Sequence, residues 1–151
     1  MMTLLKTFLL SVLPISELRG AIPYAIANNI NPWLAFLIAV LGNFLAAPLG
    51  FYFLDNLHHH FLKIKNYEKF FNKYIESKRK NFERHVGTSF EFWALILFVL
   101  IPLPLTGAWS GVLLAWFFKL KRKKSYLAIF LGIIGAGIIV TLTTLGIKNL
   151  F

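Results

Sequence analysis

The sequence has no cysteine and few acidic residues. Without cysteine, the chain can form neither a disulfide framework nor a cysteine-based metal site or nucleophile. Six Asp and Glu stand against sixteen Lys and Arg, which gives a formal net charge of +10. The basic residues cluster between long apolar runs, which is the pattern of membrane topology and of contact with anionic headgroups. We therefore expect membrane lipids rather than nucleic acid as the partner.

Enzyme motifs are also missing. The sequence contains no Walker loop, no Gly-x-Ser-x-Gly and no His-Glu-x-x-His, so neither an ATPase nor a hydrolase is indicated. The run His58-His59-His60 is a poor metal site, because consecutive helical residues point about 100° apart. We expect no enzymatic activity, no cofactor and no bound metal.

Apolar residues are abundant instead. They make up 58% of the chain and include 16 Phe and four Trp, a composition that suits lipid better than water. Residues 33–54 and 125–147 contain no charge. At 1.5 Å per residue each segment reaches roughly 33 Å, enough for a hydrocarbon core of ~30 Å. The sequence predicts two transmembrane helices here.

The remaining apolar segments are short or broken. Residues 3–13 and 21–30 are too short to cross a bilayer. Residues 92–118 are uncharged but contain I-P-L-P-L-T-G at their centre, where two prolines remove backbone donors. Such a break is tolerated only inside protein or against water. This segment is either one broken spanning helix or a re-entrant hairpin of two short arms that meet at 102–107.

The distribution of positive charge favours the hairpin. Residues 55–89 hold eight Lys and Arg, and residues 119–124 hold five. A hairpin places both groups on one side of the membrane, as the positive-inside rule prefers. We therefore predict a multi-pass protein of the cell membrane with cytoplasmic basic segments and both termini outside. The loop 55–89 also has apolar residues near helical spacing, which predicts amphipathic helices at the cytoplasmic headgroups.

Short matches between the two halves indicate a repeat. The offset between matched residues grows from 87 to 90 along the chain. The Gly-x-x-x-Ala pairs in the two long segments are suited to close helix packing. The matched positions are Gly20 with Gly107, Gly42 with Gly132, and Ala46 with Ala136.

The predicted fold is an all-α integral membrane protein with one domain. It consists of two inverted repeats, residues 1–54 and 90–151, joined by an amphipathic linker, residues 55–89. Each repeat is a re-entrant helical hairpin followed by a transmembrane helix, a plan found in many secondary transporters. A homodimer is a further expectation, since four membrane elements enclose little space alone. The residues expected to shape the hairpin tips are Pro14, Gly20, Pro23, Pro102, Pro104, Gly107 and Gly111.

Glu17 and Arg19 are the only charges between Lys6 and Asp55. Residues i and i+2 do not share a helix face, and each charge at the bilayer centre costs roughly 2.5–3.5 kcal/mol on insertion scales. At a hairpin tip both side chains can meet water, backbone or a substrate. The pair is therefore either a functional site or a structural lock between the hairpins.

Three motifs resemble the small multidrug export protein family and, more distantly, DedA-like membrane proteins with paired re-entrant hairpins. They are S-E-L-R-G-A-I-P at 16–23, L-G-N at 41–43 and P-L-P-L-T-G-A-W-S-G at 102–111. The resemblance covers nearly the whole chain except residues 55–90. The resemblance to the small multidrug export protein family implies a membrane transporter. The more distant resemblance to DedA-like proteins implies the movement of polyprenyl-phosphate lipids.

We expect secondary transport of an amphipathic or lipid-like substrate. Glu17 is the candidate proton-coupling acid, and Arg19 is the candidate contact for an anionic group. Asn43 is a polar residue within a span, suited to a bond with a tip or to an interhelical bond. The alternatives are a polyprenyl-phosphate or lipid flippase and a scaffold without transport activity. The other candidate contacts to a substrate are Ser16, Thr106, Trp109 and Ser110.

Overall fold

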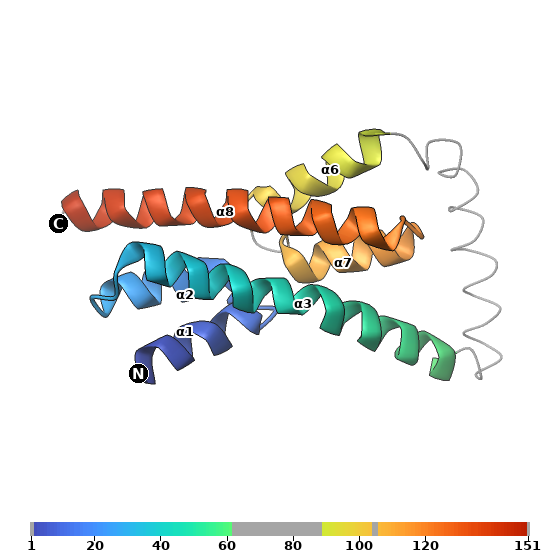
Figure 1. The fold of residues 1–151 in the computed structure, drawn as a ribbon, viewed down its shortest axis with the longest axis horizontal. Helices are drawn as coiled ribbons and strands as arrows, with labels where there is room; N and C mark the ends of the chain where they lie inside the picture. Colours follow the sequence, from blue (N-terminus) through green and yellow to red (C-terminus); the bar gives the residue numbers. More distant parts are fainter. Residues whose placement is uncertain (1, 62–88, 104–105, 151) are drawn as a thin grey trace.

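Two long helices, α3 and α8, run antiparallel along the molecule (Figure 1). The computed structural model describes residues 2–61, 89–103 and 106–150, and within these ranges it is all-helical. Pro32–Leu57 and Arg122–Lys148 are long and apolar enough to cross a membrane, as predicted from the uncharged segments. The helices of these described ranges are α1 Met2–Val12, α2 Glu17–Ala27, α3 Pro32–Phe61, α6 Ser89–Leu100, α7 Ala108–Phe117 and α8 Arg122–Leu150.

The short helices form two pairs, one in each half of the chain. We call α1 and α2 the first pair; residues 13–16 are the first break, between its helices. The second pair is α6 and α7, and the second break is residues 101–107, of which 104 and 105 are not described. The two pairs lie toward opposite ends of the long helices, and their breaks meet near the middle (Figure 1).

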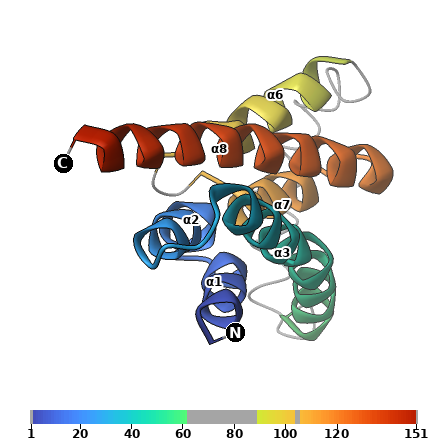
Figure 2. The ribbon, with the colours of Figure 1, turned by 60° about the vertical axis from the view of Figure 1, so that its left-hand side comes forward.

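Helix contacts follow the same scheme in both halves. In the first half α1, α2 and α3 pack against one another, and in the second half α6, α7 and α8 do so. Between the halves, α2 packs against α8, α7 packs against α3, and α3 packs against α8. Helices α1 and α6 lie on opposite sides of the long helices (Figure 2).

Small residues fill the interior and large apolar residues face outward. Ten of the buried apolar residues are alanines, for example Ala39 and Ala46 on α3. Leu37, Leu41 and Leu45 of the same helix are 41–61% exposed. An exposed apolar stripe on a long helix would be costly in water, whereas small residues at helix contacts and large ones outside are typical of helices packed in lipid.

The predicted packing glycines lie at close contacts within the chain. A Cβ at Gly42 of α3 would stand 3.0 Å from the carbonyl oxygen of Phe8 on α1. A Cβ at Gly132 of α8 would stand 2.6 Å from the Cβ of Val99 on α6. Each glycine therefore lets a long helix approach the first helix of its own half. Ala46 and Ala136, one turn further along, are buried as well.

The links α2–α3 and α7–α8 have matching backbone geometry. Asn29 and Lys119 both adopt a positive φ, 59° and 53°. The next residue in each link donates its backbone N–H to an alanine carbonyl, from Ile30 to Ala25 at 3.0 Å and from Leu120 to Ala115 at 2.9 Å. Corresponding residues here are 90 apart.

The offset of 87 predicted between Gly20 and Gly107 differs from the offset of 90 that relates the two links. Gly20 lies within α2, whereas Gly107 directly precedes α7. The two glycines therefore occupy different places in their helix pairs. The match between them reflects sequence similarity without structural equivalence.

The predicted boundary between span and linker, between residues 54 and 55, lies within a described helix. Helix α3 continues past Asp55 to Phe61, so it extends into the segment assigned to the linker. The predicted amphipathic helices of the linker, Pro104 and the side chains of residues 58–60 lie outside the described residues.

Candidate functional site

Glu17 stands where the first pair meets the second. It is the first residue of α2, directly after the first break, and it is only 6% exposed. Its φ of 45° lies in the left-handed region, which non-glycine residues rarely adopt and which is common at functional sites. Its Oε1 accepts a hydrogen bond from the backbone N–H of Trp109 at 3.4 Å. The carboxylate thus lies at the N-terminus of α7, where unpaired N–H groups favour an anion.

Gly107 makes this approach possible. Its φ of 146° is accessible to glycine and strained for other residues. A Cβ at this position would collide with the carboxylate of Glu17. The missing side chain therefore leaves the space that the carboxylate occupies.

Arg19 takes its partners from the second break. Its Nη2 donates to the carbonyl oxygen of Thr106 and lies 3.0 Å from the Thr106 hydroxyl. That hydroxyl is also 2.5 Å from the carbonyl oxygen of Ile101 and 2.8 Å from that of Leu103, so it organises the turn. Glu17 and Arg19 thus bind different groups in the second half of the chain, the N-terminus of α7 and the second break.

Trp109 adds a third link between the pairs. Its indole Nε1–H donates to the carbonyl oxygen of Val12 at 2.8 Å. Val12 is the last residue of α1, where carbonyl groups lack partners within the helix. A side chain of α7 thus supplies a hydrogen-bond donor to a carbonyl group at the C-terminus of α1.

An open cleft lies beside these contacts. This outer cleft has a volume of about 360 Å³. It is lined by a guanidinium, a carboxylate and hydroxyls together with aliphatic and aromatic side chains. Its lining residues are Pro14, Ile15, Glu17, Arg19, Thr106, Trp109, Ser110 and Leu113.

Several predicted residues lie outside the outer cleft. Ser16 is the N-cap of α2, without a side-chain capping bond, and its Oγ occupies the space beside Gly20. Pro23 lies within α2. Gly111 faces Val99 across the second pair. Pro102 is half-buried in the second break.

A second, much smaller space lies on the inner side of Glu17 and Arg19. This inner cavity has a volume of about 10 Å³. Asn43 of α3 lines it and is 1% exposed. Among the described residues, the side-chain Oδ1 of Asn43 is buried without a hydrogen-bond partner. The lining residues are Glu17, Leu18, Arg19, Asn43, Val99, Gly107, Ile133 and Ala136.

A polar cluster at the far end of α3 was not predicted. Asp55 forms an ion pair with Arg122 at 2.7 Å and accepts a bond from the indole N–H of Trp116 at 2.9 Å. The Arg122 guanidinium lies 4.3 Å from the centre of the Phe51 ring. The sequence contains one signal for this cluster. Asp55 directly follows the uncharged segment 33–54, and the basic run 119–124 directly precedes the uncharged segment 125–147.

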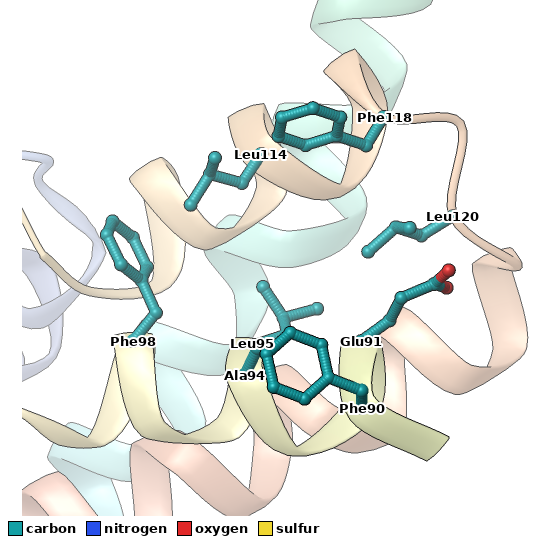
Figure 3. Close-up of a pocket in the computed structure, with 8 residues that line it drawn as sticks. All are labelled: Phe90, Glu91, Ala94, Leu95, Phe98, Leu114, Phe118 and Leu120. Carbon is teal, nitrogen blue, oxygen red and sulfur yellow. The ribbon is translucent and has the colours of Figure 1, made fainter. Parts of the chain in front are cut away.

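An apolar groove separates the two arms of the second pair. Its volume is about 190 Å³. Side chains of Phe98 and Leu95 from α6 and of Leu114 from α7 face it, and the carboxylate of Glu91 lies near Leu120 at one end (Figure 3). The groove is lined by carbon almost throughout, unlike the outer cleft.

Residues 17–139 match the family described as "Putative small multi-drug export protein". The match includes the second break, both links and the residues of the inner cavity. No curated protein and no solved structure matches the chain. The family and the two long apolar helices together indicate a membrane protein. The chain belongs to the small multi-drug export protein family, as its motifs predict.

Proposed function

We propose that the chain is a secondary, proton-coupled transporter of an amphipathic or lipid-like substrate. The observation that carries this proposal is the outer cleft, where the intramembrane charges Glu17 and Arg19 lie beside apolar surface. Ionisable residues within a membrane segment mark substrate and proton pathways. The family description supports export as the general activity.

In this proposal the two helix pairs are re-entrant hairpins of an inverted repeat. Supporting observations are the equivalent helix contacts in both halves and the meeting of the breaks near the middle of α3 and α8 (Figure 1). Transporters of this plan bind their substrate near the bilayer midplane, where broken helices meet. Unpaired backbone groups at the breaks are then satisfied within the protein, as lipid requires.

Each side chain of the outer cleft has a role in this proposal. Arg19 binds an anionic group of the substrate, since a guanidinium keeps free N–H donors beyond those given to Thr106. Trp109, Ile15 and Leu113 contact the apolar part. Glu17 takes up and releases the coupled proton, because the cleft gives its carboxyl access to water.

The same contacts favour a second candidate, a non-transporting scaffold. Glu17, Arg19 and Trp109 each join one helix pair to the other. In this alternative they only lock the fold. A third candidate, a flippase for polyprenyl phosphate, shares the site and the role of Arg19 and differs in the substrate.

Proton coupling can be tested in liposomes that contain the protein and a trace of fluorescently tagged phosphatidylglycerol. Quenching from outside then reports how fast the lipid crosses the bilayer. We expect a pH gradient to accelerate crossing with the natural chain, and Glu17→Gln to remove that acceleration. Replacing the tagged lipid with tagged polyprenyl phosphate distinguishes the flippase.

Glu91→Gln is the matched control, because it removes one acidic charge outside the outer cleft. It should respond to the gradient as the natural chain does. A Glu17→Gln protein that keeps the full response would contradict the proposal, and so would a natural chain that moves neither lipid.

A further inference from the structure

The inner cavity combines three polar groups in an otherwise apolar core. The unpartnered Oδ1 of Asn43 accepts hydrogen bonds, the Glu17 carboxylate accepts them, and the Arg19 guanidinium donates them. All three residues line the same space of about 10 Å³, together with Val99 and Ile133. A buried polar atom without a partner is destabilising, so natural proteins rarely leave one unsatisfied.

The size of the inner cavity fits one water molecule. A cavity of at least about 10–15 Å³, measured as the volume open to the centre of a water-sized sphere, holds one water. A buried water typically makes two to four hydrogen bonds to polar groups. Here one molecule can donate to Asn43 Oδ1, donate to the Glu17 carboxylate and accept from Arg19. These three bonds use the complete set of polar side chains that line the cavity.

We infer that the inner cavity is a binding site for a single structural water that joins Asn43 to Glu17 and Arg19. Asn43 is then a positioning residue for the proposed proton acceptor. The water gives the Glu17 carboxylate a hydrogen-bond donor in the inner cavity, and Glu17 also lines the outer cleft. The binding of the water is independent of transport, whereas its part in proton transfer rests on the proposed function.

Hydroxyl-radical footprinting of the intact protein in ¹⁸O-labelled water tests the site directly. An X-ray pulse converts a bound water into a radical that oxidises its neighbours and leaves the heavy oxygen on them. Val99 and Ile133 are 1% and 0% exposed and line the inner cavity. Ile22 and Ile129 are 0% exposed and do not line it. We expect ¹⁸O at the first two residues well above the level at the second two.

Equal labelling of all four residues would overturn the inference, whatever the transport assays give. The footprint needs no variant and no substrate. A failure of lipid movement in liposomes would therefore refute the proposed function while leaving the water site intact.

Asn43→Leu supplies a second readout, because a cavity with a bound water and an empty cavity predict opposite changes in melting temperature. If the water is bound, the variant loses its bridge to the two charged groups, and the melting temperature falls by about 2–4 °C for each kcal/mol lost in a chain of this size. If the cavity is dry, the variant only removes an unsatisfied oxygen, and the melting temperature rises. Ile129→Leu is the control, a volume-conserving change in the same core, and it should leave the labelling of Val99 and Ile133 unchanged. A rise with Asn43→Leu would contradict the inference.

Discussion

Glu17 and Arg19 show how two charges can be held in an apolar chain. Each finds its partner in the second half of the chain, since Glu17 accepts a bond from the backbone N–H of Trp109 and Arg19 donates to Thr106. The helix N-terminus beside Glu17 and the carbonyl beside Arg19 supply opposite partial charges. The sequence indicated that these residues need an enclosed polar site. It could not identify the partners, because Thr106 and Trp109 are about 90 positions away and carry no charge pattern of their own.

Trp109 provides a test of the contact between the breaks. Trp109→Phe keeps an aromatic ring but removes the indole N–H that binds the Val12 carbonyl. A buried acceptor that loses its donor costs about 1–3 kcal/mol. We therefore expect a lower melting temperature for the purified protein in detergent.

Trp93→Phe is the matched control, since Trp93 is 60% exposed on α6. It should change the melting temperature little. Equal shifts for the two variants would mean that the bond to Val12 contributes nothing to stability.

At the scale of helices, the glycines control how closely neighbours pack. Gly132→Leu places a side chain where Val99 and the carbonyl of Ile96 already lie, so α8 must move away from α6. Overpacking of this kind typically costs about 1–3 kcal/mol. We expect a clear fall in melting temperature.

Gly146→Leu on the same helix is the control. No atom lies within 4 Å of a Cβ at Gly146, and leucine is the better helix former by several tenths of a kcal/mol, at most about 1 kcal/mol. This variant should be as stable as the natural chain or more so. If Gly132→Leu is equally well tolerated, the close packing of α6 and α8 does not hold.

The helices were predicted better than their ends and partners. Uncharged length was enough to predict α3 and α8, and the prolines of the second break were enough to predict its interruption. Asp55 ends the uncharged segment in the sequence, whereas the helix itself continues to Phe61. In the structure Asp55 forms an ion pair with Arg122. That pairing joins residues 67 positions apart, which no local pattern reveals.

For the whole molecule, the two termini lie at one end of the long helices and the α7–α8 link lies at the other (Figure 1). Lys148 near the C-terminus also reaches the end of α2, at 3.3 Å from the Ile26 carbonyl oxygen. The basic residues of the run 119–124 therefore lie at the end opposite the two termini (Figure 1). The side of the membrane on which each end lies remains a prediction from the positive-inside rule.

Cysteine labelling tests that orientation, since the natural chain has no cysteine to interfere. Met2→Cys and Leu150→Cys replace residues that are 72% and 80% exposed. We expect an impermeant maleimide to label both from outside intact cells. Lys123→Cys, at an exposed position of the basic run, should be labelled only after the cells are opened. Labelling of Met2→Cys and Lys123→Cys from the same side would refute the topology.

The central claim is that the charges between the helix pairs serve transport and do more than lock the fold. Its most direct test measures lipid flux under a pH gradient and melting temperature for Glu17→Gln, Arg19→Gln and the double variant. In Glu17→Gln the amide oxygen of the new side chain can still accept the Trp109 N–H bond, so we predict that this variant is folded but has lost pH-driven flux. The double variant should stay inactive, because Arg19 is needed for the substrate. If Arg19→Gln instead restores both stability and flux to Glu17→Gln, the pair is a structural lock, and the transport account is wrong.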